Sequence, residues 1–257
     1  MSKKIKIIAT IGLATKEKDV LREMIKSGMD YIRLNFSHGT YSEHSNYIQN
    51  IKELNQELNT EIKIIADLSG PRMNTENGHS FNSNTQDIVT AKDIKDLEFV
   101  LKEGVDLVAM SYISSAEDIS LLRNKMQDLG KVLPIIAKIE RKLAYYNIDE
   151  IIKEADMIMI ARGDLGNEVP LEQIPFIEKD IINRCNQNNK LVIVATQMML
   201  SMTENNIPTR AEVTDVTYAI LSGADFVMLS EETAKGKYPI ETIKMMHQII
   251  EESTKHI

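Results

Sequence analysis

The stretch that decides the fold is LPIIAKIERKLAYYNIDEIIKEADMIMIARGDLG, residues 133–166. It contains two short apolar runs, at 133–139 and 157–161, separated by a longer segment with helical spacing. Strands that are apolar without alternation are typical of a parallel sheet that helices cover on both faces. The stretch therefore predicts a strand, a helical connection and a second, parallel strand.

The same alternation recurs along the whole chain. Apolar runs stand at 5–10, 31–35, 62–68, 105–111, 133–139, 157–161, 191–195 and 226–229, each followed by a segment with helical spacing. Gly28, Gly104, Gly130 and Gly223 stand where helices should end, and Ser115 with Asp118 three residues later suits a helix start.

Eight such units in 257 residues are the usual size of a (β/α)8 TIM barrel. A doubly wound open sheet is the alternative, but no G-x-G-x-x-G follows the first strand, since ATIGLATKE contains only Gly12. We therefore expect an α/β protein with one TIM-barrel domain over residues 1–257. The polar segment SGPRMNTENGHSFNSNTQDIVTA, residues 69–91, shows no apolar period and is expected to be the one long irregular loop.

Composition narrows the function classes. The net charge of −8 disfavours binding to nucleic acid or anionic membranes, which draws on clustered Lys and Arg. The single cysteine, Cys185, excludes an internal disulfide framework and a cysteine metal cluster, and a buried structural role is expected for it. Without a stretch of membrane-spanning length, the sequence predicts a cytoplasmic protein without nucleic-acid or membrane partners.

Polar residues gather at the carboxyl ends of the predicted strands, where a TIM barrel places its active site. They are Arg33, Asn35 and Ser37 at the second strand, Asp67 at the third, Ser111 at the fourth, Lys138 and Glu140 at the fifth, Asp164 after the sixth, Thr196 at the seventh, and Ser230 and Glu232 at the eighth. These residues are the candidate site.

Lys138 and Glu140 are two positions apart on one strand, so their side chains share a face. Glu140 and Asp164 form the kind of carboxylate pair that Mg²⁺ or Mn²⁺ accepts, and a lysine beside the metal would stabilise an enolate or a transferring phosphoryl group. The alternative is a buried Lys138–Glu140 ion pair without a metal. Gly163 and Gly166 flank Asp164 and would let backbone N–H groups approach an anion.

Longer motifs in the chain resemble the pyruvate kinase family. They are KIIATIG, GMDYIRLNFSHG (28–39), ADLSGP (66–71), AKIE (137–140), ARGDLGNEVP (161–170), RCNQNNKLVIVATQM (184–198), PTRAEVTDV (208–216) and GADFVMLSEETAKGKYP (223–239). Together they run through almost the whole chain. The resemblance implies a barrel of the phosphoenolpyruvate/pyruvate type.

The resemblance also implies roles for single residues. Glu140 and Asp164 would hold Mg²⁺ or Mn²⁺, and Lys138 would stabilise the phosphoryl group and the enolate. The remaining roles are Thr196 at the substrate carboxylate and the proton-transfer face, Gly163 and Asp164 gripping the carboxylate through their backbone, Arg33 at the phosphate, Ser111 lining the substrate site and Ser230 in the proton path. The family's potassium site would correspond to Asn35, Ser37, Asp67 and the Leu68 backbone. Arg72 is expected to supply the positive charge there, so potassium would not be required.

Several features depart from the family pattern. Residues 69–91 stand where relatives carry an inserted lid domain, and the family's C-terminal effector domain is expected to be absent. Asn74 and Ser114 stand where the family carries arginines, and Glu231 replaces the glycine of its LSGET motif. Because closure keeps water from competing for a phosphoryl group, phosphotransfer is expected to be reduced or altered.

Three functional hypotheses follow. The first is a metal-dependent enzyme that acts on phosphoenolpyruvate, pyruvate or a related 2-oxo acid through an enolate. The second is a lyase, a decarboxylase or aldolase, on a 2-oxo acid. The third is a non-catalytic binding or regulatory relative, and a homo-oligomer is expected in each case.

Overall fold

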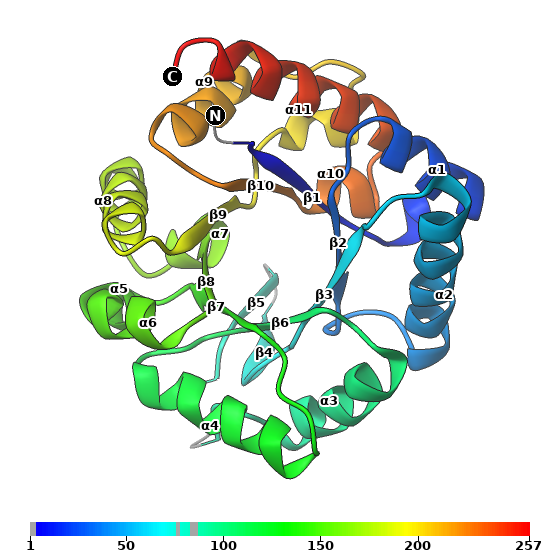
Figure 1. Ribbon diagram of the computed structural model, residues 1–257. Helices are drawn as coiled ribbons and strands as arrows, with labels where there is room; N and C mark the ends of the chain where they lie inside the picture. The colour runs from blue at the N-terminus through cyan, green and yellow to red at the C-terminus, as the bar shows by residue number, and fades with distance from the viewer. Residues whose placement is uncertain (1–3, 76–77, 83–86) are drawn as a thin grey trace. The chain divides into compact units, whose positions relative to one another are not determined.

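The computed structural model describes residues 4–75, 78–82 and 87–257. Within these residues, eight parallel strands form a closed barrel in the order β1-β10-β9-β8-β7-β6-β3-β2 (Figure 1). The strands are β1 Lys6–Thr10, β2 Tyr31–Asn35, β3 Lys63–Asp67, β6 Leu107–Met110, β7 Ile135–Ile139, β8 Met157–Ala161, β9 Leu191–Ala195 and β10 Phe226–Leu229. All eight predicted strands and the (β/α)8 fold class are therefore confirmed.

The stretch at 133–166 forms the predicted strand, helical connection and strand. In β7 and β8 every residue is buried, and the two strands pair in parallel with Ile136 opposite Met157 and Ala137 opposite Ile158. Two short helices, α5 (Lys142–Tyr146) and α6 (Ile148–Glu154), connect them. Burial on both faces is the physical reason for the unbroken apolar runs.

The remaining helices follow the strands along the chain (Figure 1). They are α1 Lys18–Lys26, α2 Tyr41–Leu58, α3 Ala91–Glu103, α4 Ala116–Asp128, α7 Arg162–Leu165, α8 Ile174–Gln187, α9 Arg210–Leu221, α10 Glu231–Ala234 and α11 Pro239–Thr254, with 3-10 turns η1 Leu13–Thr15, η2 Leu171–Gln173 and η3 Leu200–Thr203. Gly28, Gly104, Gly130 and Gly223 have positive φ angles of 109°, 72°, 89° and 104°. Glycine adopts this conformation without steric cost, which explains its use after helices.

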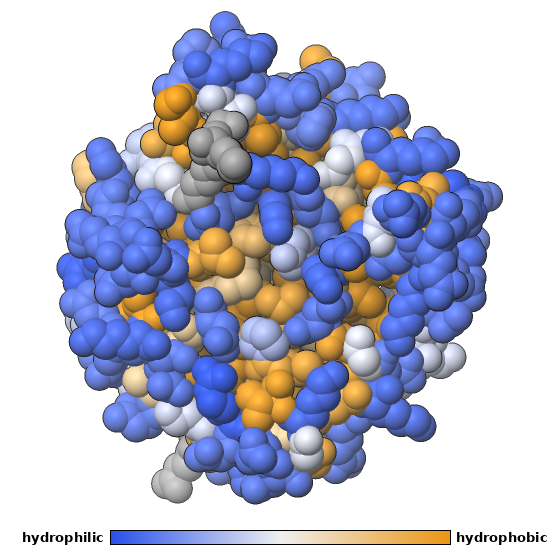
Figure 2. Space-filling view, in the orientation of Figure 1, coloured by the Kyte–Doolittle hydropathy of each residue, from blue (hydrophilic) through white to orange (hydrophobic). Residues whose placement is uncertain are grey.

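Buried apolar side chains form the core, and Cys185 is buried among them, as predicted. Hydrophilic residues predominate on the surface seen in Figure 2, in agreement with the acidic composition. In the part of the chain that the structure describes, every helix is too short or too polar to cross a bilayer.

The chain divides into two compact units. Unit 1 comprises Met1–Leu34, Gly39–Ile65 and Val192–Ile257, and unit 2 comprises Asn35–His38 and Ala66–Leu191. Unit 1 therefore holds β1, β10 and all of β9 after Leu191, whereas β6, β7 and β8 belong to unit 2. The candidate site residues are described below within the unit that contains them.

The segment 69–91 differs from the expected irregular loop. It contains an antiparallel pair, β4 (Arg72–Thr75) and β5 (Gly78–Phe81), with Arg72 opposite Phe81 and Met73 opposite Ser80. A two-stranded hairpin satisfies its backbone groups by mutual pairing, so it forms here without an apolar period that would have revealed it. Residues 76–77 and 83–86 of this segment lie outside the described residues.

The start of α4 provides a test of local structure. The Asp118 carboxylate accepts hydrogen bonds from the backbone N–H groups of Ser114 at 2.6 Å and Ser115 at 3.2 Å. We expect Asp118→Ala to lower the free energy of unfolding by about 1–2 kcal/mol, because it removes the acceptor for both groups. Asp128→Ala, at the other end of the same helix, should change it by less than about 0.5 kcal/mol. Equal effects of the two substitutions in urea unfolding would contradict this account.

Candidate functional site

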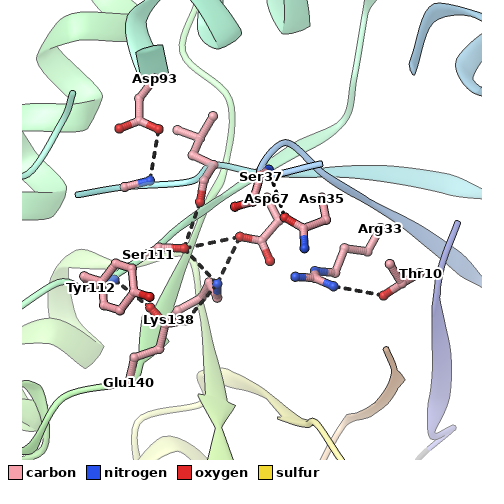
Figure 3. A network of polar contacts seen from close by, with 12 residues as sticks. Thr10, Arg33, Asn35, Ser37, Asp67, Asp93, Ser111, Tyr112, Lys138 and Glu140 are labelled. Carbon is pink, nitrogen blue, oxygen red and sulfur yellow. Dashed lines mark hydrogen bonds and ion pairs between the residues drawn. The ribbon is translucent and has the colours of Figure 1, made fainter. Parts of the chain in front are cut away.

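The centre of the candidate site in unit 2 is the ammonium group of Lys138. Its Nζ lies 2.8 Å from Glu140 Oε1, 2.8 Å from Ser111 Oγ and 3.1 Å from Asp67 Oδ1 (Figure 3). Asp67 ends β3, Ser111 follows β6, and Lys138 and Glu140 lie at the end of β7. The structure thus brings together residues from three strand ends, and the expected shared face of Lys138 and Glu140 is confirmed.

Backbone contacts hold these groups in place. Ser111 Oγ donates to the Leu68 carbonyl at 2.8 Å, and the Tyr112 N–H donates to Glu140 Oε2 at 2.7 Å. Both carboxylate oxygens of Glu140 are therefore engaged, one by the lysine and one by the backbone. A site fixed in this way is organised before a substrate arrives.

Burial governs the electrostatics of the cluster. Lys138, Glu140 and Asp67 are 8%, 2% and 1% exposed. Burial raises the pKa of Glu140 to about 7; Lys138 opposes this shift, while Asp164 and then Asp67 add to it. Asp164 lies on the short helix α7, which follows β8.

This pKa has a measurable consequence for the metal-free protein. Between the ordinary pKa of 4.5 and about 7, folded Glu140 keeps a proton that the unfolded chain has lost. The stability that Glu140 contributes is therefore present in full below pH 4.5 and is lost as the pH rises through 7. The loss is on the order of 3 kcal/mol.

Urea unfolding of the wild type and Glu140→Gln in a chelator, from pH 5 to pH 8, isolates this contribution. All other titrating groups are the same in the two proteins. From pH 5 to pH 8, the unfolding free energy of the wild type should therefore fall, relative to that of Glu140→Gln, by on the order of 3 kcal/mol. A difference that is the same at every pH would show that Glu140 titrates normally.

The expected monovalent-cation residues also lie in unit 2. Ser37 N–H donates to Asn35 Oδ1 at 3.0 Å, and Phe36 N–H donates to the Asp67 carbonyl at 3.0 Å. This segment is therefore anchored at the end of β3. Arg72 begins β4 of the hairpin, and its Nε is buried without a hydrogen-bond partner among the described residues.

Arg33, Thr196 and Ser230 belong to unit 1. Arg33 Nη1 donates to Thr10 Oγ1 at 3.0 Å, and Thr10 Oγ1 donates to the Leu229 carbonyl at 2.9 Å. The Ser230 hydroxyl is buried and unpartnered within the described residues, while its N–H donates to Glu232 Oε2 at 2.8 Å. Thr196 and Ser230 directly follow β9 and β10, as predicted, whereas Arg33 lies in the middle of β2 rather than at its end.

Thr196 has an unusual backbone. It follows β9 with a φ of 73°, and Gln197 after it has a φ of 54°. A β-branched residue in the left-handed region is a steric outlier, and such strain concentrates at functional sites. No residue pattern around Thr196 predicted this strain.

Three residues that support the site were not predicted from the sequence. Thr10 ends β1 and binds Arg33, and the strand-end rule applied to the first strand would have found it. Tyr112, with a φ of 59°, holds Glu140, and Asp93 accepts the Gly70 N–H at 3.1 Å beside the hairpin. The capping pattern of Thr90 with Asp93 was readable in the sequence, whereas nothing in it indicated the role of Tyr112.

The carboxylates of Glu140 and Asp164 suit a divalent cation that keeps coordination positions open for other ligands. Among the described residues, no three His, Cys, Asp or Glu side chains are grouped closely enough to hold a metal by themselves. Glu140 and Asp164 repel one another electrostatically, and a cation between such carboxylates relieves that repulsion. Mg²⁺ is often held by two carboxylates, with water and substrate oxygens as the other ligands. The residues present therefore fit such an ion.

Comparisons with known proteins agree with the motifs. The family model described as "Pyruvate kinase, barrel domain" matches residues 2–87 and 82–243. Proteins named pyruvate kinase are 36% identical in Thermococcus litoralis, over 96% of this chain and 69% of the relative, and 33% identical in Mycobacterium tuberculosis, over 97% and 70%. One in Agrobacterium vitis is 35% identical over 98% of this chain and 68% of the relative. This chain belongs to the pyruvate kinase family.

Proposed function

We propose that the chain is a pyruvate kinase-like enzyme that acts on phosphoenolpyruvate or pyruvate through an enolate stabilised at Lys138. The observation that carries the proposal is the position of Lys138 Nζ, within 3.1 Å of Asp67, Ser111 and Glu140. A buried cation held at several points stabilises negative charge that develops on a nearby oxygen without first having to reorganise. Such charge develops both on a transferring phosphoryl group and on an enolate oxygen.

Glu140 and Asp164 are the proposed ligands of Mg²⁺ or Mn²⁺. When bound, the ion would neutralise charge and orient the 2-oxo acid through its oxygens. The backbone at Gly163 and Asp164 would hold the substrate carboxylate, and Ser111 would line the substrate site beside Lys138. Potassium is proposed to be dispensable, with Arg72 supplying the charge.

The family resemblance supports roles for three residues of unit 1 as well. Arg33, oriented by Thr10, would bind the phosphate of phosphoenolpyruvate. In the direction of pyruvate, the phosphoryl group leaves the enolate oxygen for its acceptor, and the enolate carbon then takes a proton. Thr196 and the Ser230 hydroxyl are proposed to serve that proton transfer.

Phosphotransfer is proposed to be reduced or altered. The alignment with the Thermococcus litoralis relative runs over 328 positions, more than the 257 residues of this chain, so the relative carries residues that this chain lacks. The two matched segments of the family model meet at residues 82–87. Both facts support a short hairpin segment, 69–91, in place of the lid domain. Without closure, water competes for the phosphoryl group.

The same hairpin favours a second candidate, a lyase acting on a 2-oxo acid. Decarboxylation of oxaloacetate passes through the same enolate but requires no enclosed nucleotide. The non-catalytic alternative is disfavoured because the lysine and both carboxylates are retained. The chain is further proposed to work in the cytoplasm as a homo-oligomer, in which the exposed side chains of Leu171 and Phe176 are available for burial.

One set of assays separates these candidates. Purified protein with Mg²⁺ or Mn²⁺ is mixed with phosphoenolpyruvate and ADP, with oxaloacetate, and with pyruvate in deuterated water. Pyruvate formed only from oxaloacetate would reject phosphotransfer and support the lyase. Absence of turnover in both reactions, together with no deuterium exchange at the pyruvate methyl group, would reject both enzymatic candidates.

A further inference from the structure

Three buried hydrogen-bond donors lie around the β4–β5 hairpin. They are Nε of Arg72, the hydroxyl of Tyr112 and Nε of Arg141, and none has a hydrogen-bond partner among the described residues. Buried polar atoms in native proteins are almost always paired, so each exception requires an explanation. Three buried donors without an acceptor indicate a ligand that carries several hydrogen-bond acceptor atoms.

Aromatic contacts gather these donors. The guanidinium carbon of Arg141 lies 3.8 Å from the centre of the Phe81 ring, and that ring is centred 5.8 Å from the Tyr112 ring. Arg72 is opposite Phe81 in the hairpin register. The hairpin thus supplies one donor itself and positions Phe81 against the residues that carry the other two.

Arg141 is further oriented by a polar contact. Its Nη1 donates to Ser114 Oγ at 2.5 Å, so stacking on Phe81 and this hydrogen bond together fix the guanidinium plane. The Arg141 guanidinium group is thus held in one orientation beside the hairpin.

The charges around these donors favour an anion. Within the described residues, neither Arg72 nor Arg141 forms an ion pair with a carboxylate. A tyrosine hydroxyl is protonated at neutral pH and can donate a hydrogen bond.

We propose that Arg72, Tyr112 and Arg141 form a second anion site, which takes a phosphate group. Guanidinium groups match the geometry of phosphate oxygens, and a protonated hydroxyl adds a third donor. Identification of that phosphate as part of a second substrate rests on the proposed function, whereas the anion site itself does not. In this chain the hairpin segment would then contribute phosphate contacts that are independent of a lid.

Calorimetric titration with inorganic phosphate at pH 7.5, without metal, tests the site. Wild-type protein should bind saturably, and Arg141→Met should weaken binding at least about tenfold because it removes a charge-assisted contact. Arg141→Lys should retain part of the affinity. The control Arg184→Met removes the same charge from exposed ion pairs on α8 and should change the affinity less than twofold, a limit set by its weak, screened contribution.

Tyr112→Phe separates binding from structure. Its hydroxyl has no partner among the described residues, so the substitution should weaken phosphate binding without lowering the melting temperature of the unliganded protein. ADP, AMP and adenosine in parallel titrations identify the source of the phosphate. ADP binding that is tighter than that of inorganic phosphate, with no binding of adenosine, would assign it to a nucleotide, and equal affinities would assign it to free phosphate.

Oxalate is a mimic of the pyruvate enolate. Its binding in the presence of Mn²⁺ is measured separately, because it reports on the proposed metal site and not on the anion site. Arg141→Met should bind oxalate as the wild type does. Wild type without saturable phosphate binding, Arg141→Met with unchanged phosphate affinity, or equal losses of phosphate and oxalate binding would each overturn the proposal. Failure of the wild type to bind oxalate while phosphate still binds would reject the proposed function and leave the anion site standing.

Discussion

Lys138→Met is expected to reduce pyruvate formation by about a hundredfold to a thousandfold, whichever of the two reactions the wild type catalyses. The substitution keeps the length of the side chain but removes the cation that lies 2.8 Å from Ser111 Oγ and from Glu140. Loss of one such stabilising group typically has an effect of this size on the rate. Steady-state assays with phosphoenolpyruvate and ADP and with oxaloacetate measure it.

The same substitution is expected to lower stability. It leaves the buried carboxylates of Asp67 and Glu140 without their shared partner, which costs about 3–5 kcal/mol at a neutral or higher pH. Because burial raises the pKa of Glu140 to about 7, protonation should reduce this cost below that pH.

Lys237→Met provides the control for loss of a lysine. Lys237 is exposed and pairs with Glu204 at 2.5 Å in unit 1, so its replacement should leave both the free energy of unfolding and the rate nearly unchanged. Folding of Lys138→Met is monitored by circular dichroism and melting temperature. A folded variant with more than a tenth of the wild-type rate would refute the role assigned to Lys138.

Glu140→Gln is expected to weaken Mn²⁺ binding by at least about 100-fold, the upper end of the loss for groups that only orient a metal ligand. The amide oxygen can still accept the Tyr112 N–H, and Lys138 keeps Asp67, so the local geometry has support after the charge is removed. The variant therefore tests the carboxylate charge rather than the fold. Titration calorimetry and the electron paramagnetic resonance signal of free Mn²⁺ both measure the affinity.

Glu178→Gln is the matched control. Glu178 is also 2% exposed in unit 2 and pairs with Arg162 at 3.2 Å, but it is not a proposed ligand. Its replacement should leave the Mn²⁺ affinity within about twofold of the wild type while costing comparable stability. If the two variants lose the same affinity, or neither loses any, Glu140 is not a metal ligand.

Much of the fold was predictable because buried strands appear in the sequence as unbroken apolar runs. The predicted runs at 31–35, 157–161, 191–195 and 226–229 match β2, β8, β9 and β10 to the residue. The run at 105–111 overestimated β6, Leu107–Met110, because apolar residues continue beyond the hydrogen-bonded strand. The hairpin β4–β5 was missed because pairing between backbone groups does not require an apolar pattern in the sequence.

The sequence by itself determined the barrel, the family and the strand-end residues, because unbroken apolar runs and long motifs are properties of consecutive residues. Only the tertiary structure placed the Lys138 ammonium between three partners, raised the pKa of Glu140 and revealed the strain at Thr196. Only the tertiary structure brought Arg141, Phe81 and Tyr112 together around the hairpin. These properties depend on distance and desolvation among residues far apart in the chain, and no local pattern of residues encodes them.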